Sequence, residues 1–253
     1  MDSKKGKLFV ILGGIFIANA LLAEFIGGKI FSLEASIGMN PIHLRIFGYE
    51  LPFNMTAGVL LWPVVFILTD IINEYFGKKG VRFLSYFAVG LISYSFLMIY
   101  FAIGLEPADF YISSQAENGI PDMNKAFGFV FGQGLWIIAG SLVAFLIGQI
   151  ADVTVFQWIK KRTGEKKLWL RATGSTLVSQ LIDSFVVLFI AFYLGPAKWA
   201  LSLVIGIGIV NYIYKFIVAA LLTPFLYVIH NRIDNYLGKD LAQKMLEEAK
   251  SDA

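Results

Sequence analysis

The dominant pattern in the chain is a series of long apolar runs with almost no charge, separated by short charged segments. A run of about 20 apolar residues has the length that an α-helix needs to cross a bilayer. Six spans are predicted, over residues 8–25, 55–76, 81–105, 126–158, 168–194 and 200–230. We therefore expect an all-α integral membrane protein, a bundle of six transmembrane helices over residues 1–230, followed by a tail over residues 231–253.

The composition supports this class and excludes several kinds of site. Hydrophobic residues make up 57% of the 253 residues, whereas soluble domains have about 45–50%. The absence of cysteine excludes disulfides, thiolate catalysis and cysteine-bound metals. The two histidines lie in or beside expected loops, so we expect no metal and no cofactor. A net charge of +3 does not suggest nucleic acid as a partner.

Basic residues predict the orientation, because most of them fall in alternate connecting segments. These segments precede the first span, join the second to the third and the fourth to the fifth, and follow the sixth. Their basic residues are Lys4, Lys5, Lys7, Lys78, Lys79, Arg82, Lys160, Lys161, Arg162, Lys166, Lys167, Arg171, Arg232, Lys239 and Lys244. Positive residues stay on the cytoplasmic side. Both termini are therefore expected in the cytoplasm, in a multi-pass protein of the plasma (inner) membrane.

Three segments outside the spans have some character of their own. Residues 31–54 contain the alternating stretch IHLRIFGYELPF, which predicts a short hairpin or a lid. Residues 106–125 are polar and irregular, and the charged cytoplasmic tail from Asn231 is expected to be a short helix or a solvated end.

Polar side chains within the spans are the candidates for function. A charge at mid-bilayer costs about 2.5–3.5 kcal/mol on insertion scales, so such groups usually face the bundle interior. A rise of about 1.5 Å per residue places them at two depths. The inner layer is expected to hold Asp70, Glu74, Asp152 and Arg171. The central layer is expected to hold Asn19, Glu24, Asp183, Asn211 and Lys215.

Structural roles compete with binding roles at most of these positions. Asp70 and Glu74 either reach the interface or pair with Arg171, and a cluster of Asp70, Asp152 and Arg171 is predicted. Ser175 and Ser179 permit close helix packing as readily as ligand contact. Gln149 and Asp152 are equally open. Asp183 and Lys215 lie deep in their spans, where a binding role is favoured, and Lys215 is expected to neutralise Asp183 or Glu24.

Four motifs in series carry a family resemblance. The stretches TDIINEYFGKK, GQIADVTVF, STLVSQLIDSFVVLFIAFY and NYIYKF together resemble the queuosine precursor transporter family, also described as "putative vitamin uptake transporters". The resemblance implies import of 7-deazaguanine bases, the precursors of the tRNA nucleoside queuosine. The family's intramembrane polar motifs match Asp70, Gln149, Asp152, Ser175, Thr176, Asp183, Tyr212 and Lys215. Asn73 and Glu74 stand where relatives carry other residues, which weakens them as candidates.

The residues and the resemblance together predict a transporter for a small-molecule deazaguanine base, with no catalytic residues. The expected substrate-binding residues are Asn19, Glu24, Asp70, Gln149, Asp152, Ser175, Ser179, Asp183, Asn211, Tyr212 and Lys215. The chain has no G-x-x-x-x-G-K-[ST] loop for nucleotide hydrolysis. One alternative is a substrate-binding subunit of a multi-component vitamin importer. An intramembrane enzyme is disfavoured by the lack of H-E-x-x-H, cysteine and a Ser–His arrangement. The oligomeric state stays open, a homodimer included.

Overall fold

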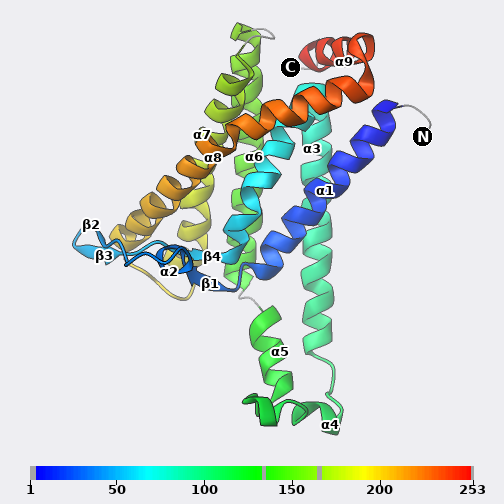
Figure 1. Ribbon diagram of the computed structural model, residues 1–253. Helices are drawn as coiled ribbons and strands as arrows, with labels where there is room; N and C mark the ends of the chain where they lie inside the picture. Colours follow the sequence, from blue (N-terminus) through cyan, green and yellow to red (C-terminus); the bar gives the residue numbers. More distant parts are fainter. Residues whose placement is uncertain (1–3, 133–134, 164–166, 252–253) are drawn as a thin grey trace.

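The computed structural model describes residues 4–132, 135–163 and 167–251, which are dominated by helices (Figure 1). The longer helices are α1 (Lys4–Ile26), α3 (Trp62–Ile103), α5 (Met123–Phe131), α6 (Leu135–Thr163), α7 (Leu168–Leu188), α8 (Leu201–Leu237) and α9 (Lys239–Ser251). Short turns of helix are α2 (Leu33–Ser36), η1 (Ala57–Leu60), α4 (Asp109–Ile112), η2 (Ala116–Asn118) and the π-helix η3 (Phe189–Leu194), which extends α7. Among the described residues, five helical stretches are long and apolar enough to cross a membrane. The expected all-α membrane architecture is confirmed at this level.

Helix α3 reverses direction at Gly77, where φ is 66° and ψ is −172°. Only glycine adopts that backbone conformation at little cost. The ring of Phe76, just before the reversal, packs on Phe9 near the start of α1, with 4.9 Å between the ring centroids. In the second half of α3, the ring of Phe96 packs on Phe25 near the end of α1, with 5.9 Å between the ring centroids. The two halves of the 42-residue α3 therefore run in opposite directions, as Figure 1 shows, with the turn where the sequence predicted a connection.

Two predicted span boundaries are wrong. The second span begins at Trp62 rather than at residue 55, because residues 54–56 form a strand and residues 57–60 form η1. The fourth predicted span, over residues 126–158, lies within the stretch Met123–Thr163, which is one of the five candidate spans and contains α5 and α6. The sixth span continues beyond residue 230, since α8 ends at Leu237.

Residues 30–56, the hairpin segment, form two small antiparallel pairings. Strand β1 (Ile30–Ser32) pairs with β4 (Asn54–Thr56), and β2 (Leu44–Ile46) pairs with β3 (Tyr49–Leu51). Phe47 and Gly48 join β2 to β3 with positive φ values of 50° and 84°, as a two-residue primed turn requires. The predicted short hairpin is confirmed. It packs on α8, where the Leu51 side chain lies 2.8 Å from the position that a Cβ on Gly206 would take.

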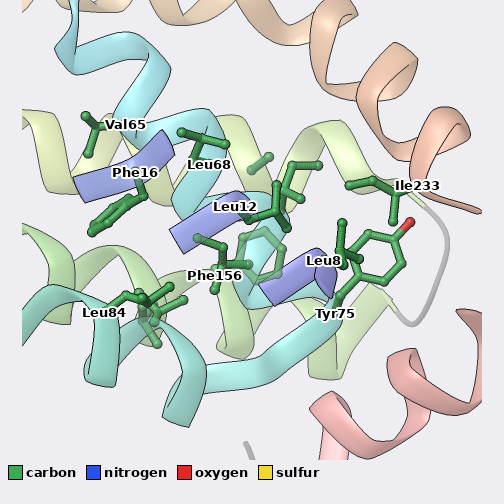
Figure 2. Packing of buried hydrophobic residues seen from close by; sticks show 14 of the residues in the cluster. Leu8, Leu12, Phe16, Val65, Leu68, Tyr75, Leu84, Phe156 and Ile233 are labelled. Atoms are coloured by element: carbon green, nitrogen blue, oxygen red, sulfur yellow. The ribbon is translucent and has the colours of Figure 1, made fainter. Parts of the chain in front are cut away.

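The hydrophobic core lies between α1, both halves of α3, α6 and the end of α8 (Figure 2). Leu8, Leu12 and Phe16 of α1 pack there with Val65 and Leu68 of α3, and with Phe156 of α6 and Ile233 of α8. Close approach depends on small residues, as expected for helices in lipid. The outward faces instead carry large exposed apolar side chains, among them Phe83, Phe101, Leu221 and Phe225. Such faces suit contact with lipid rather than water.

Both ends of the chain lie at the same end of the bundle (Figure 1). The Lys4 ammonium donates to the Tyr236 carbonyl at 2.8 Å, and Lys5 pairs with Glu248 at 2.6 Å. Helix α9 packs against the reversal of α3, where a Cβ at position 77 would lie 3.2 Å from the Ala249 backbone, closer than an ordinary contact. The start of α1, the turn of α3 and the C-terminal helix therefore form one layer.

Candidate functional site

A cavity with about 520 Å³ of empty space, open volume at its mouth included, lies between the first half of α3, α7 and α8. Its polar lining residues are Asp70, Thr173, Thr176, Gln180, Lys215 and Thr223. Trp62 and Phe66 are the aromatic residues in the wall. They stand one and two turns before Asp70 on α3, so a single face of that helix supplies both the rings and the carboxylate.

Asp70 is buried in the cavity wall with weak protein partners. The hydroxyls of Ser175 and Thr176 donate to its two carboxylate oxygens, each at 3.4 Å. That separation is long, since O–H···O bonds usually measure about 2.7–2.8 Å. In the part of the chain that the structure describes, no Lys, Arg or His forms an ion pair with Asp70. The carboxylate therefore retains capacity to accept hydrogen bonds from a ligand.

Two further groups on the wall can bind polar atoms. Gln180 is 4% exposed, and its Oε1 has no hydrogen-bond partner among the described residues. Lys215 lines the cavity and forms an ion pair with Asp183, as the sequence predicted for one of two carboxylates. The other carboxylate, Glu24, accepts a hydrogen bond from Ser141 and lies close enough to interact electrostatically with Asp183. The cavity lining thus presents a carboxylate acceptor from α3, an amide from α7 and a cation from α8.

Behind this wall, α6 contributes a second polar layer. Asp152 is completely buried, and Ser179 donates to its Oδ1 at 3.1 Å. Gln149 exchanges a hydrogen bond with Thr69 of α3 at 3.2 Å. These side chains join α6 to α3 and α7 and are not among the residues that line the cavity.

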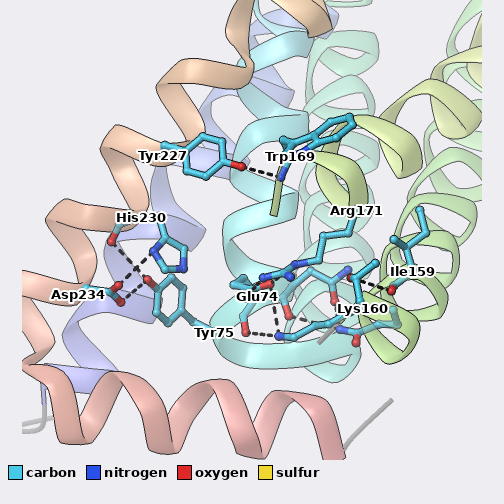
Figure 3. A network of polar contacts seen from close by, with 12 residues as sticks. Glu74, Tyr75, Ile159, Lys160, Trp169, Arg171, Tyr227, His230 and Asp234 are labelled. Carbon is cyan, nitrogen blue, oxygen red and sulfur yellow. Dashed lines mark hydrogen bonds and ion pairs between the residues drawn. The ribbon is translucent and has the colours of Figure 1, made fainter. Parts of the chain in front are cut away.

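Nearer to α9, Glu74 is the centre of a buried ion cluster (Figure 3). Arg171 donates to its two carboxylate oxygens at 2.5 and 3.1 Å, and Lys160 lies 3.3 Å away. All three side chains are at most 1% exposed. The predicted cluster of Asp70, Asp152 and Arg171 is therefore wrong, because Arg171 pairs with the carboxylate one helical turn further along α3. The sequence analysis missed Lys160 by assigning it to a solvated loop.

The same end of the bundle is tied to α8 (Figure 3). Tyr75 donates from its hydroxyl to Asp234 at 2.6 Å, and His230 lies 3.1 Å from the same carboxylate. The backbone N–H of Trp169 donates to the Tyr227 hydroxyl at 3.1 Å. These contacts and the Glu74 cluster hold α3, α7 and α8 together between the cavity and α9.

The predicted site residues fall into four groups. Asp70, Thr176 and Lys215 reach the cavity, whereas Gln149, Asp152, Ser175 and Ser179 lie in the layer behind it. Asp183 and Glu24 are linked to the cavity through Lys215. Asn19 donates to the Ile15 carbonyl of its own helix at 2.8 Å, and Asn211 and Tyr212 are half-buried on α8 outside the lining.

Sequence reasoning missed Trp62, Phe66, Thr173 and Thr223 as wall residues and left Gln180 out of the site. A spacing signal existed for some of them. Trp62, Phe66 and Asp70 follow one another at intervals of four, which places them on one helical face. The abundance of aromatic residues, with 23 Phe in the chain, hid this signal.

Comparisons with known proteins identify a family of membrane transporters. Residues 56–229 match the family described as "Putative vitamin uptake transporter". A Bacillus subtilis (strain 168) protein named "Probable queuosine precursor transporter" is 32% identical over 188 residues, which cover 72% of this chain and 76% of that protein. The "Queuosine precursor transporter" of Escherichia coli (strain K12) is 28% identical over 197 residues, covering 77% and 79% of the two chains. No solved structure matches the chain.

Proposed function

This chain belongs to the family described as "Putative vitamin uptake transporter", and from that premise we propose that it imports queuosine precursors, which are 7-deazaguanine bases. It is a multi-pass transporter of the cell membrane and not an enzyme. The substrate proposal takes its support from the relatives, which are named as queuosine precursor transporters. The observation that carries the proposal is the cavity that holds Asp70, Gln180 and Lys215 beside two aromatic rings.

The wall of the cavity suits a guanine-like base. Such a base presents a ring N–H and an exocyclic amine side by side, and one carboxylate can accept both in a bidentate pair. Asp70 supplies this carboxylate, and its present hydroxyl contacts are long enough to be exchanged. Lys215 can donate to the base carbonyl, and the Gln180 amide can serve a remaining donor. Trp62 and Phe66 offer faces on which a planar base can stack.

The same groups explain selectivity. The cavity lining places Asp70 and Gln180, both buried, where a base would contact them. A base without the paired donors would leave Asp70 and Gln180 buried and unpaired. Unpaired polar groups of this kind reject a wrong ligand more strongly than a lost apolar contact does.

Asp183 enters this proposal through Lys215. In the empty site the carboxylate neutralises the ammonium, which lowers the cost of holding a cation at this depth. A base carbonyl that binds Lys215 competes with Asp183, so that binding is linked to a local rearrangement. Asn211, one turn before Lys215 on the same helix, remains a candidate for the substrate path.

The proposed topology has six crossings with both termini in the cytoplasm. Support comes from the reversal of α3 at Gly77, which divides one 42-residue helix into two antiparallel lengths. At about 1.5 Å per residue the undivided helix would measure about 63 Å, roughly twice the hydrocarbon thickness. The termini lie at one end of the bundle (Figure 1), where α9 packs on the reversal of α3 at Gly77, which Lys78 and Lys79 follow in the sequence. Basic residues favour the cytoplasmic side.

The test is uptake of a labelled 7-deazaguanine base by cells that lack their own synthesis and uptake. We expect this chain to restore uptake and Asp70→Asn to weaken it. Losing a charge-assisted hydrogen bond costs about 1.5–3 kcal/mol, which is roughly a tenfold to hundredfold loss in affinity. The matched control is Asp109→Asn, the same change at an exposed residue of α4. Cells with the wild-type protein that import no more base than empty cells would refute the function, and unchanged affinity in Asp70→Asn would refute the site.

A further inference from the structure

Three hydroxyl groups of α7 contact more acceptor atoms than they have hydrogens to donate. Ser175 contacts Asp70 Oδ1 at 3.4 Å and a main-chain carbonyl at 3.1 Å. Ser179 contacts Asp152 Oδ1 at 3.1 Å and a main-chain carbonyl at 3.0 Å. Thr176 contacts Asp70 Oδ2 at 3.4 Å. These are five contacts to acceptors, but each hydroxyl has one hydrogen.

One additional proton on the carboxyl groups would supply the missing hydrogen. The protonated carboxyl group would donate to a serine Oγ, and the O–H of that serine would donate to the main-chain carbonyl. The Ser175 hydroxyl is placed for this exchange, because it interacts with Asp152 as well as with Asp70. Asp152 also has a completely buried Oδ2 that lacks a hydrogen-bond partner among the described residues. Both features point to a missing proton.

The charges around the two carboxylates support the same conclusion. Neither Asp70 nor Asp152 forms an ion pair within the described ranges, whereas Glu74, one turn away, binds both Arg171 and Lys160. Among the described residues that line the cavity with Asp70, the charged one is Lys215 of α8, and it pairs with Asp183. Two neighbouring carboxylates in an apolar interior do not readily ionise together.

A ligand of the cavity has access to only one member of this pair. Asp70 lines the cavity with Gln180, whose Oε1 is buried and unpartnered among the described residues, whereas Asp152 lies behind the wall. A base with two adjacent donors requires Asp70 to be ionised. The proton that Asp70 gives up can remain in the cluster only on Asp152.

We propose that Asp70 and Asp152 share one proton and that entry of the base is coupled to entry of this proton. The inference rests on the proposed function. When the base binds, the O–H bond of Asp70 breaks and its proton passes to the Ser175 oxygen. Ser175 gives its own hydrogen to Asp152, so one O–H bond forms for each that breaks and the total charge is unchanged. The loaded site then holds an ionised Asp70 on the base and a protonated Asp152. After the base leaves on the cytoplasmic side, the reverse transfer returns the proton through Ser175 to Asp70, which releases it to the cytoplasm. The emptied site takes up the next proton from outside before it binds another base, so one proton enters with each base.

The experiment uses the purified full chain alone in proteoliposomes with a labelled 7-deazaguanine base. Counterflow against unlabelled base, without a pH gradient, reports transport itself. Uptake with the outside one pH unit more acidic reports coupling, for which one proton per base predicts about tenfold accumulation. We expect a protonophore to abolish the accumulation and a pH dye inside the vesicles to report acidification that depends on the base.

Asp152→Asn separates the two readouts. It should retain counterflow and lose the tenfold accumulation, while the exposed control Asp109→Asn should retain both. Three results would each overturn the proton site and leave the proposed function standing. They are wild-type counterflow without accumulation, accumulation that requires Na⁺ instead of a pH gradient, and full accumulation by Asp152→Asn. Absence of wild-type counterflow would refute the proposed function and this inference with it. The wild-type measurements decide the question even if the variant cannot be purified.

Discussion

The buried ion cluster predicts an unequal response to the removal of its members. Glu74 is the carboxylate that Arg171 and Lys160 share, and all three side chains are at most 1% exposed. Glu74→Gln would remove this charge from both ion pairs at once. Arg171→Met would break one of the two pairs and keep the pair of Glu74 with Lys160. The structure therefore predicts that loss of the anion is worse than loss of the arginine.

The expected magnitudes follow from these contacts. Removal of one partner from a buried ion pair typically costs about 3–5 kcal/mol, and Glu74→Gln should reach the upper part of that range because it breaks the pairs with both Arg171 and Lys160. Arg171→Met loses two charge-assisted hydrogen bonds to a carboxylate that retains a cation, so about 1–3 kcal/mol is expected. The double variant should cost less than the sum of the single variants by about 1–3 kcal/mol, as directly interacting residues do.

Reversible unfolding in mixed detergent micelles, followed through the five tryptophans, can measure these free energies. The matched control is Asp70→Asn, the same acid-to-amide change one turn away at a carboxylate without an ion pair among the described residues. This control should change the free energy of unfolding by less than about 1 kcal/mol, within the range of substitutions that break no strong interaction. A Glu74→Gln loss no larger than that of Asp70→Asn, or strictly additive effects, would refute the reasoning.

Four further predictions concern other parts of the chain. Gly77→Ala should destabilise the protein by about 1–3 kcal/mol, since φ is 66° there and a Cβ would lie 3.2 Å from Ala249. In the same unfolding assay the control Gly90→Ala, in open space on the same helix, should stabilise the protein by about 0.5–1 kcal/mol. Burial alone would raise the pKa of Glu34, but hydrogen bonds from the Phe53 and Ile42 backbone and from Ser32 hold the pKa below its ordinary 4.5. The ionised carboxylate therefore stabilises the hairpin segment at pH values above 4.5. This stabilisation is lost as the pH falls through the lowered pKa. Limited proteolysis should show the segment opening in acid, and Glu34→Gln should already be open at neutral pH; equal protection of the variant would contradict this. Asp183→Asn should reach the membrane normally and bind the base at least as tightly as the wild type in uptake assays, because Asp183 no longer competes with the base carbonyl for Lys215; a loss of affinity would contradict this competition. Tags at both termini should be cytoplasmic and a tag near Glu117 external, and an odd number of crossings in reporter fusions would overturn the topology.

The sequence predicted the helical architecture because lipid imposes a length and an apolar composition on each span. It also located the reversal of α3, since basic residues and Gly77 interrupt two apolar runs there. It did not predict that residues 55–61 leave the helix. Met55 is as apolar as a span residue, but it pairs with Phe31 in a strand that comes from a distant part of the chain. Periodicity within one segment carries no information about such a partner.

The candidate site was predictable in its residue types and less so in its pairings. Lys215 and Asp183 pair as expected, because both lie deep on neighbouring spans joined by a short connection. Two carboxylates on one face of α3, Asp70 and Glu74, were possible partners of Arg171. Arg171 pairs with Glu74 because of the rotation and depth of the helices, which one sequence does not reveal. Lys160 belongs to a basic stretch that resembles any solvated loop. Its complete burial results from packing against the reversal of α3.

The most direct test of the central claim is equilibrium binding of a labelled 7-deazaguanine base to the purified protein in lipid nanodiscs. The account predicts saturable binding of one base per chain that guanine-type bases displace and adenine, which lacks the paired donors, does not. Asp70→Asn should weaken this binding at least tenfold, through loss of a charge-assisted hydrogen bond of about 1.5–3 kcal/mol, while Asp109→Asn binds as the wild type does. Saturable binding that adenine displaces equally well, or that Asp70→Asn leaves unchanged, would contradict the claim that the cavity beside Asp70 recognises the base.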